Sequence, residues 1–413
     1  MSVTTPFSAN FSRFDDAKLS QAAVVIPLLM GLVAPSTPSW ALLFYLTAIP
    51  ALAWKLWRGW RPDFRNPALA AMLLLWGWSA LAIIWDRDVS GHGKSQIFWM
   101  FSAFFTLVFV LNFISAQDEQ PRTRDRAMAA LVYGAAANAI LSLGLFVIKG
   151  DFLTRLWGWG ISGNPVMGAA IMDIGLLLAL SRASADAGPH GYGQRWKMAA
   201  AAVPMIAFLA VSYSRTALLA MAAALLLIAL GRRPLLAVLT ALVMAGAALV
   251  LWKFGSVLFP MLWENLASRG SDCHAVLWRA AWQAFLNRPL IGFGPSATLP
   301  NMGPSQPYCP PYPSPHSLYL SILLYSGAIG LVLFVTTIAL LWRHLNLATE
   351  GFSRRVWLGV GLVPLIVGIS DLVQIIKGPS PMWYILWMPM LLVLTLPVAA
   401  KPTRAFPRAR ADR

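Results

Sequence analysis

Long apolar runs recur from one end of this chain to the other, and they restrict its fold more than any other feature. Hydrophobic residues make up 58% of the 413 residues, and charged residues only 12%. A helix needs about 20 apolar residues to cross a hydrocarbon layer of roughly 30 Å. It also satisfies its own backbone hydrogen bonds there. The sequence therefore predicts an all-α integral membrane protein.

The apolar runs predict about twelve transmembrane helices. They lie near residues 21–34, 39–54, 67–85, 95–115, 127–148, 165–181, 197–213, 216–230, 235–252, 317–341, 356–373 and 382–399. We expect spans one to nine in residues 1–252, a large polar loop at 253–316, spans ten to twelve in 317–399 and a basic tail at 400–413. No cleavable signal peptide is expected, because Asp15 and Asp16 precede the first run and no small-residue cleavage site follows a short apolar core.

The distribution of Lys and Arg predicts the orientation. If the N-terminus is cytoplasmic, 22 of the 32 basic residues fall on that side of the membrane. The positive-inside rule then places both termini in the cytoplasm and the large loop outside. Contacts between basic loops and anionic membrane lipids account for much of the net charge of +16, and no nucleic-acid binding is implied.

Arg215 interrupts a long apolar stretch whose two ends are both basic. Residues 198–230 must cross the membrane twice, and only Ser212-Tyr-Ser-Arg215-Thr offers an outer turn. One interpretation is an arginine that reaches lipid headgroups. The other is a guanidinium that binds a phosphate or pyrophosphate in a bidentate geometry.

The large loop contains an apolar spacing at Leu277, Ala281 and Phe285 that predicts an amphipathic helix lying against the membrane. Its basic residues exceed what the positive-inside rule favours outside the membrane. We therefore expect an anion site formed with Arg215 by loop arginines, for which the candidates are Arg269, Arg279 and Arg288.

Several fragments occur in an order that resembles one family. The Ser-Arg turn at 212–215 is followed by the Trp-containing helix, by Pro289-Leu-Ile-Gly-Phe-Gly294 and by His316-Ser, which opens a span; Gly160-Ile-Ser-Gly-Asn164-Pro165 opens an earlier one. Over roughly residues 155–342 the chain resembles the bacterial O-antigen ligase family, which is related to O-antigen polymerases and pilin oligosaccharide transferases. His274 stands where many relatives in the wider superfamily carry an Arg, so the assignment among the loop arginines stays open.

The resemblance implies a glycosyltransferase of GT-C-like architecture in the bacterial inner membrane, with its active site facing the periplasm. Its donor would be a glycan on undecaprenyl pyrophosphate, and its acceptor a sugar of the lipid A core in lipopolysaccharide biosynthesis. Asn164, within the matching fragment, would have a supporting role. No cofactor is implied.

His316 is the best candidate for a general base. Transfer of a sugar to a hydroxyl needs a proton acceptor, which at neutral pH is usually a histidine. Of the other four histidines, His190 and His344 fall on the cytoplasmic side, His92 in a distant loop and His274 in the same large loop. The alternative is that His316 only caps the following helix.

Few carboxylates are expected on the outer side, and none forms an Asp-x-Asp pair beside His316. Fixed arginines can stabilise the departing pyrophosphate in place of a metal. We therefore expect a metal-free site and a single displacement, although Asp371 or Glu264 stays possible as a nucleophile. Asp371, near the outer end of the eleventh span, is expected to orient His316, to pair with an arginine or to lie in water beside Lys377.

The chain has only two cysteines, Cys273 and Cys309, and both fall in the outer loop. An oxidising periplasm would allow them to form a disulfide.

The sequence thus favours an O-antigen ligase. A polymerase of lipid-linked repeat units is a rival in the same class. A transporter or flippase of an anionic lipid is a rival in another class, but we find no internal repeat and few charges within the spans.

Overall fold

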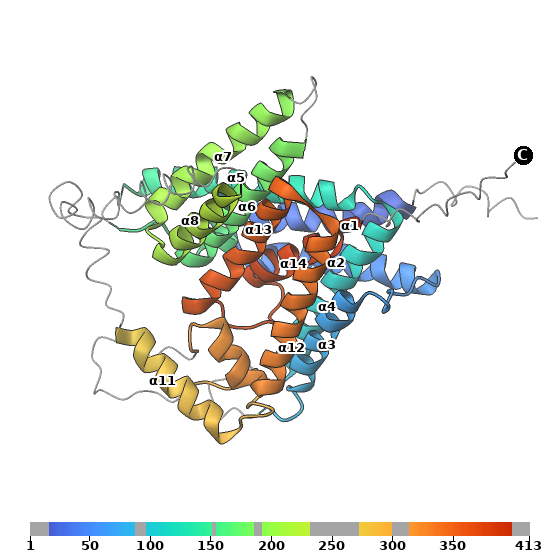
Figure 1. The fold of residues 1–413 in the computed structure, drawn as a ribbon, viewed down its shortest axis with the longest axis vertical. Coiled ribbons are helices and arrows are strands. Elements are labelled where there is room, and N and C mark those ends of the chain that lie inside the picture. The colour runs from blue at the N-terminus through green and yellow to red at the C-terminus, as the bar shows by residue number, and fades with distance from the viewer. Residues whose placement is uncertain are drawn as a thin grey trace, which may run out of the picture.

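The computed structural model describes residues 16–86, 96–150, 154–185, 192–231, 272–299 and 314–398, and every regular element in these ranges is helical (Figure 1). The predicted all-α fold is therefore confirmed for the described residues. The elements are α1 (Asp16–Val33), α2 (Thr37–Trp57), α3 (Pro67–Leu81), α4 (Gln96–Glu119), α5 (Thr123–Lys149), η3 (Gly160–Ser162), α6 (Pro165–Ala185), α7 (Tyr192–Ser212), α8 (Arg215–Leu230), α11 (Asp272–Asn287), α12 (Leu318–Ala348), α13 (Gly351–Ser370), η5 (Trp383–Trp387) and α14 (Met388–Leu394).

Seven helices within the described ranges are long and apolar enough to cross a membrane, and four shorter apolar helices accompany them. These eleven segments coincide with eleven of the predicted runs. The remaining run, 235–252, lies outside the described residues, so the number of twelve spans stays a prediction. The proline-rich junction between the first two runs separates α1 from α2, which begins with proline in its first turn.

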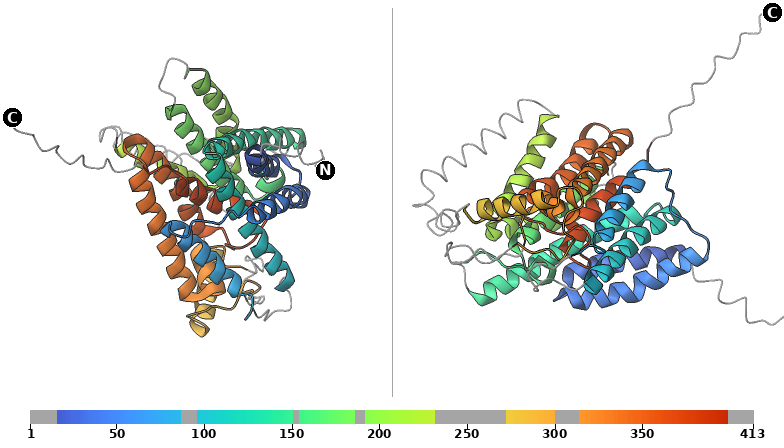
Figure 2. Two further views of the ribbon diagram at one scale, coloured as in Figure 1. Left: turned by 90° about the vertical axis from the view of Figure 1, so that its right-hand side faces the viewer. Right: turned by 90° about the horizontal axis from the view of Figure 1, so that it is seen from below.

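The helices pack into one bundle. α1 lies against α5, α2 and α4; α13 packs on α8 and α6; and α12 packs on α3. Small residues allow neighbouring helices to pack closely. At Gly359 of α13, for example, an added Cβ would lie only 3.2 Å from the Cβ of Ala224 of α8. Seen from below, α11 lies across the end of this bundle (Figure 2).

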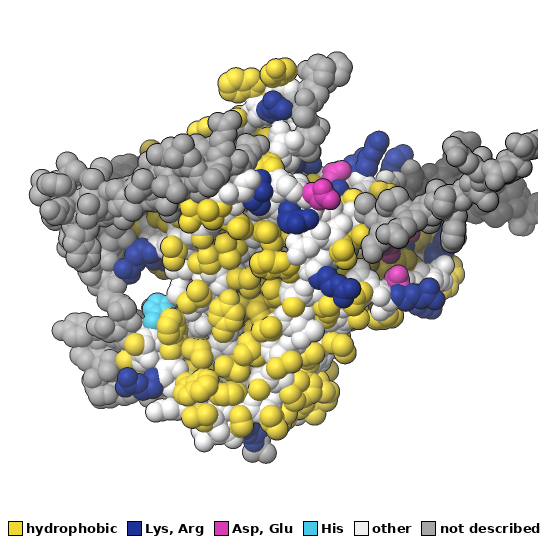
Figure 3. Space-filling model, viewed as in Figure 1, with side chains coloured by type: hydrophobic (Ala, Val, Ile, Leu, Met, Phe, Trp, Pro, Cys, Tyr) yellow, Lys and Arg dark blue, Asp and Glu magenta, His cyan; other side chains and the backbone are white. Residues whose placement is uncertain are grey.

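One side of the bundle is covered mainly by hydrophobic side chains (Figure 3). Lys and Arg side chains gather above this apolar area, near the end where α12 stops and α13 begins. Exposed apolar residues such as Val332 and Val335 of α12, 63% and 58% exposed, would be costly in water. Such a surface is the one expected for contact with lipid.

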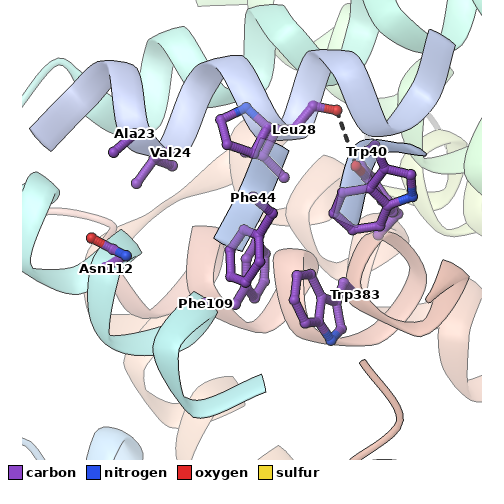
Figure 4. Close-up of a pocket in the computed structure, with 10 residues that line it drawn as sticks. Ala23, Val24, Leu28, Trp40, Phe44, Phe109, Asn112 and Trp383 are labelled. Carbon is purple, nitrogen blue, oxygen red and sulfur yellow. Dashed lines mark hydrogen bonds between the residues drawn. The ribbon is translucent and has the colours of Figure 1, made fainter. Parts of the chain in front are cut away.

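The inner core contains a cluster of aromatic rings around η5. Trp383 stacks on Phe109 at 4.5 Å and meets Phe44 edge-on at 4.8 Å. Tyr384 donates a hydrogen bond of 3.1 Å to the carbonyl of Leu28, and a small pocket between α1, α2, α4 and η5 lies among these residues (Figure 4). The residues that line this pocket are mainly apolar or aromatic, and they include no carboxylate, imidazole or guanidinium.

α12 is broken in its N-terminal third at Gly327, where the backbone has φ 68° and ψ −170°. A break at this depth leaves backbone groups without helical partners, which is costly away from water. The segment that follows α11, residues 289–294, fills the break and is called the inserted segment below. Its hydrogen bonds run from Phe293 N to Leu324 O (2.8 Å), Gly294 N to Tyr325 O (3.0 Å), Ala328 N to Pro289 O (2.8 Å) and Ile329 N to Leu290 O (3.3 Å).

The glycines of the inserted segment are required by this close approach. Gly292 has φ 68°, and a Cβ there would lie 2.6 Å from the backbone carbon of Tyr325. Asp86, just beyond α3, holds the segment from the other side, because its carboxylate accepts hydrogen bonds from the amide (2.9 Å) and the hydroxyl of Ser296. Pro-Leu-Ile-Gly-Phe-Gly therefore has a structural explanation.

Candidate active site

Asp371 follows directly after the last residue of α13. Its backbone is extended, with φ −154° and ψ −165°, and its side chain is buried. One carboxylate oxygen accepts a 2.9 Å hydrogen bond from the amide of Leu372 and lies 3.6 Å from Nδ1 of His316. That separation is within ion-pair range and longer than a hydrogen bond.

His316 stands immediately before Ser317, the N-cap of α12. Its side chain is 28% exposed, whereas that of Asp371 is 5% exposed. Since Nδ1 faces the carboxylate, Nε2 is on the opposite side of the ring. A buried carboxylate next to a more accessible imidazole can orient the ring.

Arg215 is the first residue of α8 and its side chain is exposed. The turn before it closes where predicted, since α7 ends at Ser212 and α8 begins at Arg215. The next residue, Thr216, joins this turn to the end of α13 through a 2.7 Å hydrogen bond between its hydroxyl and that of Ser370. The start of α8 is therefore attached to the residue before Asp371.

His274 of α11 reaches the same point. Its Nε2 lies 3.2 Å from the carbonyl oxygen of Ser370, and its ring meets Trp278 edge-on at 5.9 Å. The apolar side of α11, which carries Leu277 and Ala281, is buried against Leu324 and Tyr325 of α12. The apolar face predicted to lie on the membrane thus packs on the protein itself.

Three non-glycine residues of the described chain have a positive φ: Tyr213 at 48°, His316 at 47° and Leu372 at 63°. Each is a candidate residue or stands within two positions of one. A side chain in this region costs about 1–3 kcal/mol and persists only where the surroundings enforce it. Such strain is concentrated at functional sites, and here it marks the turn before Arg215, His316 itself and the residue after Asp371.

The other predicted residues fall into three groups. Asn164 caps α6, since its side-chain oxygen accepts hydrogen bonds from the amides of Val166 (2.8 Å) and Met167 (3.2 Å).

Cys273 is disulfide-bonded, while Cys309 and Arg269 lie outside the described residues. Within the described part of the chain no group of three metal-ligating side chains occurs, and metal independence stays a prediction.

The two described loop arginines are not equivalent. The guanidinium of Arg288, at the end of α11, lies over the ring of Phe293 at 5.2 Å. Arg279 is exposed, and at about 100° per residue it projects roughly 140° away from His274 around the helix. Neither is brought to the junction where His274, Thr216 and Ser370 meet.

The sequence analysis did not identify three of the residues at this junction. His274 was noted as a histidine of the loop that stands where many relatives carry an Arg, but it was not predicted to belong to the site, and Thr216 and Ser370 were not singled out. The spacing of His274 and Trp278, four residues apart on one helix face, was the available signal for His274. Thr216 and Ser370 gave no comparable signal, because short hydroxyl side chains are common near helix ends.

The described structure is all-helical, with helices apolar enough to cross a membrane, and it pairs the buried Asp371 with the partly exposed His316 at the end of α13, which is bonded to the start of α8. Residues 200–335 match the family model described as O-antigen ligase, a range that includes Arg215, His274 and His316. The chain is also 26% identical over 371 residues to an O-antigen ligase of Pseudomonas aeruginosa, covering 86% of this chain and 84% of that protein. Both matches confirm the resemblance to the O-antigen ligase family, whose members are glycosyltransferase-type enzymes.

Proposed function

We propose that the protein is an O-antigen ligase of the bacterial inner membrane. It transfers a polysaccharide from undecaprenyl pyrophosphate to a sugar hydroxyl of the lipid A core, at the periplasmic face and by single displacement. The observation that carries this proposal is the junction at the end of α13, where Asp371 lies 3.6 Å from His316 and Ser370 is bonded to the helix that Arg215 begins.

His316 acts as the general base. The acceptor hydroxyl loses its proton to Nε2 while its oxygen bonds to the anomeric carbon of the glycan. At the same time the bond from that carbon to the pyrophosphate oxygen breaks, and undecaprenyl pyrophosphate leaves. Asp371 lies at the Nδ1 edge of the ring, where it orients His316 and stabilises the imidazolium that forms during the reaction.

Arg215 binds the pyrophosphate. Its planar guanidinium matches two phosphate oxygens, and it stands at the N-terminus of α8, where backbone amides and the helix dipole favour an anion. The N-cap Ser214 makes no side-chain cap, and its buried hydroxyl has no hydrogen-bond partner in the described structure. These groups supply positive potential without a metal.

The name of the Pseudomonas relative favours a ligase over a polymerase of repeat units. The two activities differ in the acceptor, because a polymerase extends one lipid-linked glycan with another. A ligase therefore makes a product that requires the lipid A core, and a polymerase makes longer lipid-linked chains without it. The Asp–His pair supports an enzyme over a transporter of anionic lipids.

The test uses the purified full chain in liposomes with a lipid-linked glycan donor, with or without lipid A core, and with or without EDTA. We expect product only with the core acceptor and no effect of EDTA. His316→Ala should lower the rate by about 10²–10⁴, and Arg215→Ala by about 10²–10³. Arg215→Lys should recover only part of the rate, because an ammonium cannot reproduce the guanidinium fork.

The matched controls are a histidine and an arginine that lie far along the chain from the two candidates: one is near the other end of α12, and the other is at the far end of the α7–α8 pair. His344→Ala changes a histidine near the inner end of α12, whose ring nitrogen lies 3.1 Å from the carbonyl of Leu396. Arg195→Ala changes an exposed arginine at the start of α7. Both should keep most of the activity. Near wild-type turnover by His316→Ala, at matched protein level, would remove the assignment of the base.

A further inference from the structure

Ser370 ends α13 with both of its polar groups bonded to other helices. The last carbonyls of a helix have no partner within it, and here the carbonyl of Ser370 is 3.2 Å from Nε2 of His274. A carbonyl only accepts, so Nε2 must carry a hydrogen, which it does in one neutral tautomer and in the protonated ring. The hydroxyl of Ser370 is bonded to Thr216 at 2.7 Å.

The carboxylate of Asp371 lacks an anchor of this kind. Within the described residues, its partners are the amide of the next residue, Leu372, and His316 at 3.6 Å. The amide of Asp371 still bonds to the carbonyl of Val367 at 3.0 Å, so its position follows the last turn of α13. The direction of the carboxylate therefore depends on where Ser370 is held.

Two features fix the side chain of His274. Its ring meets Trp278 edge-on at 5.9 Å and 78°. The neighbouring residue, Cys273, is disulfide-bonded, which tethers the start of α11 covalently. The ring therefore approaches Ser370 from a helix that is itself held in place.

We infer that His274 and Thr216 are positioning residues that hold Ser370 from two sides and so keep Asp371 beside His316. This inference rests on the proposed function, because it assigns a role toward the same base. Neither residue touches the reacting atoms: His274 contributes a donor and Thr216 a hydroxyl. Helices α8 and α11, which come from separate parts of the chain, thus align the base through one serine.

The test compares paired variants in the liposome assay. Loss of one neutral hydrogen bond corresponds to about a three- to tenfold change, so His274→Ala and Thr216→Val should lower kcat by that factor and leave the KM for the donor unchanged. His274→Gln keeps an N–H donor and Thr216→Ser keeps the hydroxyl. Both conservative variants should recover at least half of the rate.

The background variant Asp371→Ala separates positioning from a general loss of structure. If the two residues act through Asp371, His274→Ala and Thr216→Val should cause little further loss of kcat once that carboxylate is gone. A full three- to tenfold loss in this background would overturn the inference. Wild-type kcat in His274→Ala, or no recovery in His274→Gln, would overturn it as well.

Failure of this inference is distinguishable from failure of the proposed function. If the base assignment is wrong, His316→Ala stays active; if only the positioning role is wrong, His316→Ala is inactive and His274→Ala is not. Should His274→Ala fail to accumulate, the Thr216 variants decide alone: Thr216→Val exchanges the hydroxyl for a methyl group at nearly constant size, whereas Thr216→Ser keeps the hydroxyl and should recover the rate.

Discussion

Two helices of this protein lose regular hydrogen bonding near one end, α12 at Gly327 and α13 at its last residue, Ser370, and the partners are supplied in different ways. In α12 the break at Gly327 is filled by backbone, with four hydrogen bonds from the inserted segment. At the end of α13 the partners of Ser370 are side chains, those of Thr216 and His274. Backbone fills a break with groups that do not titrate, whereas side chains bring ionisable groups to the same depth. The first arrangement is suited to fixing the fold, and the second lies at the site for which we propose chemistry.

Gly292→Ala should have the largest effect, because it disrupts the contacts between the inserted segment and the break in α12. A Cβ at this position would lie 2.6–2.7 Å from the backbone of Tyr325 and Gly327, and φ is 68°. We expect a loss of about 2–5 kcal/mol in the free energy of unfolding and poor accumulation in membranes. The measurement is the thermal melting of purified protein.

Gly361→Ala is the matched control. It lies within α13, where a Cβ would meet nothing within 4 Å. Alanine is favoured over glycine in a helix by about 0.5–1 kcal/mol, so this variant should be as stable as the wild type or more so. Equal melting of Gly292→Ala and the wild type would mean that the inserted segment does not hold the fold.

Asp371→Asn changes the residue that follows the end of α13 and should leave the fold intact. Asparagine keeps an oxygen that can accept from the amide of Leu372 but removes the charge facing His316. We expect a fall in kcat smaller than the roughly 10⁴-fold loss seen when an aspartate that is hydrogen-bonded to a catalytic histidine is replaced by asparagine, because the present contact is longer than a hydrogen bond. Unchanged kcat with unchanged melting would show that the carboxylate is dispensable.

Gln374→Met tests the link between the two regions and should have the smallest effect. The side-chain amide of Gln374 donates a 2.7 Å hydrogen bond to the carbonyl of Pro295, next to the inserted segment. Its loss leaves a buried acceptor without a partner, so we expect about 1–3 kcal/mol of destabilisation and a smaller fall in kcat than in Asp371→Asn. The exposed Gln283→Met is the control, and equal melting of both variants would show that the link contributes nothing.

Most of the helices could be predicted from the sequence. Hydropathy reports which residues avoid water, and it located the apolar helices and the turn at Ser212–Arg215 correctly. The break at Gly327 could not be predicted in this way, because it lies within a continuous apolar run. Its cause is a segment more than 30 residues away that supplies matching backbone groups, and hydropathy carries no information about pairing.

The candidate site was predictable only in part. Arg215 and His316 stood out because a charge or an imidazole at a span end is rare in so apolar a chain. The proximity of Asp371 to His316 was one of the alternatives that the sequence left open, and the 3.6 Å separation favours it. The contacts of His274 depend on how α11 docks on the bundle, which is decided by three-dimensional packing.

The length of α8 has a consequence for the lipid around it. Its 16 residues rise only about 24 Å at 1.5 Å per residue, less than the average hydrocarbon thickness of roughly 30 Å. A short span is accommodated by local thinning of the bilayer. Where the bilayer thins in this way, the headgroup layer lies closer to the bilayer centre at α8 than beside longer helices such as α5 and α12. The lipid-linked diphosphate that we propose as the donor would then meet the guanidinium of Arg215 close to the depth at which its hydrocarbon tail anchors it.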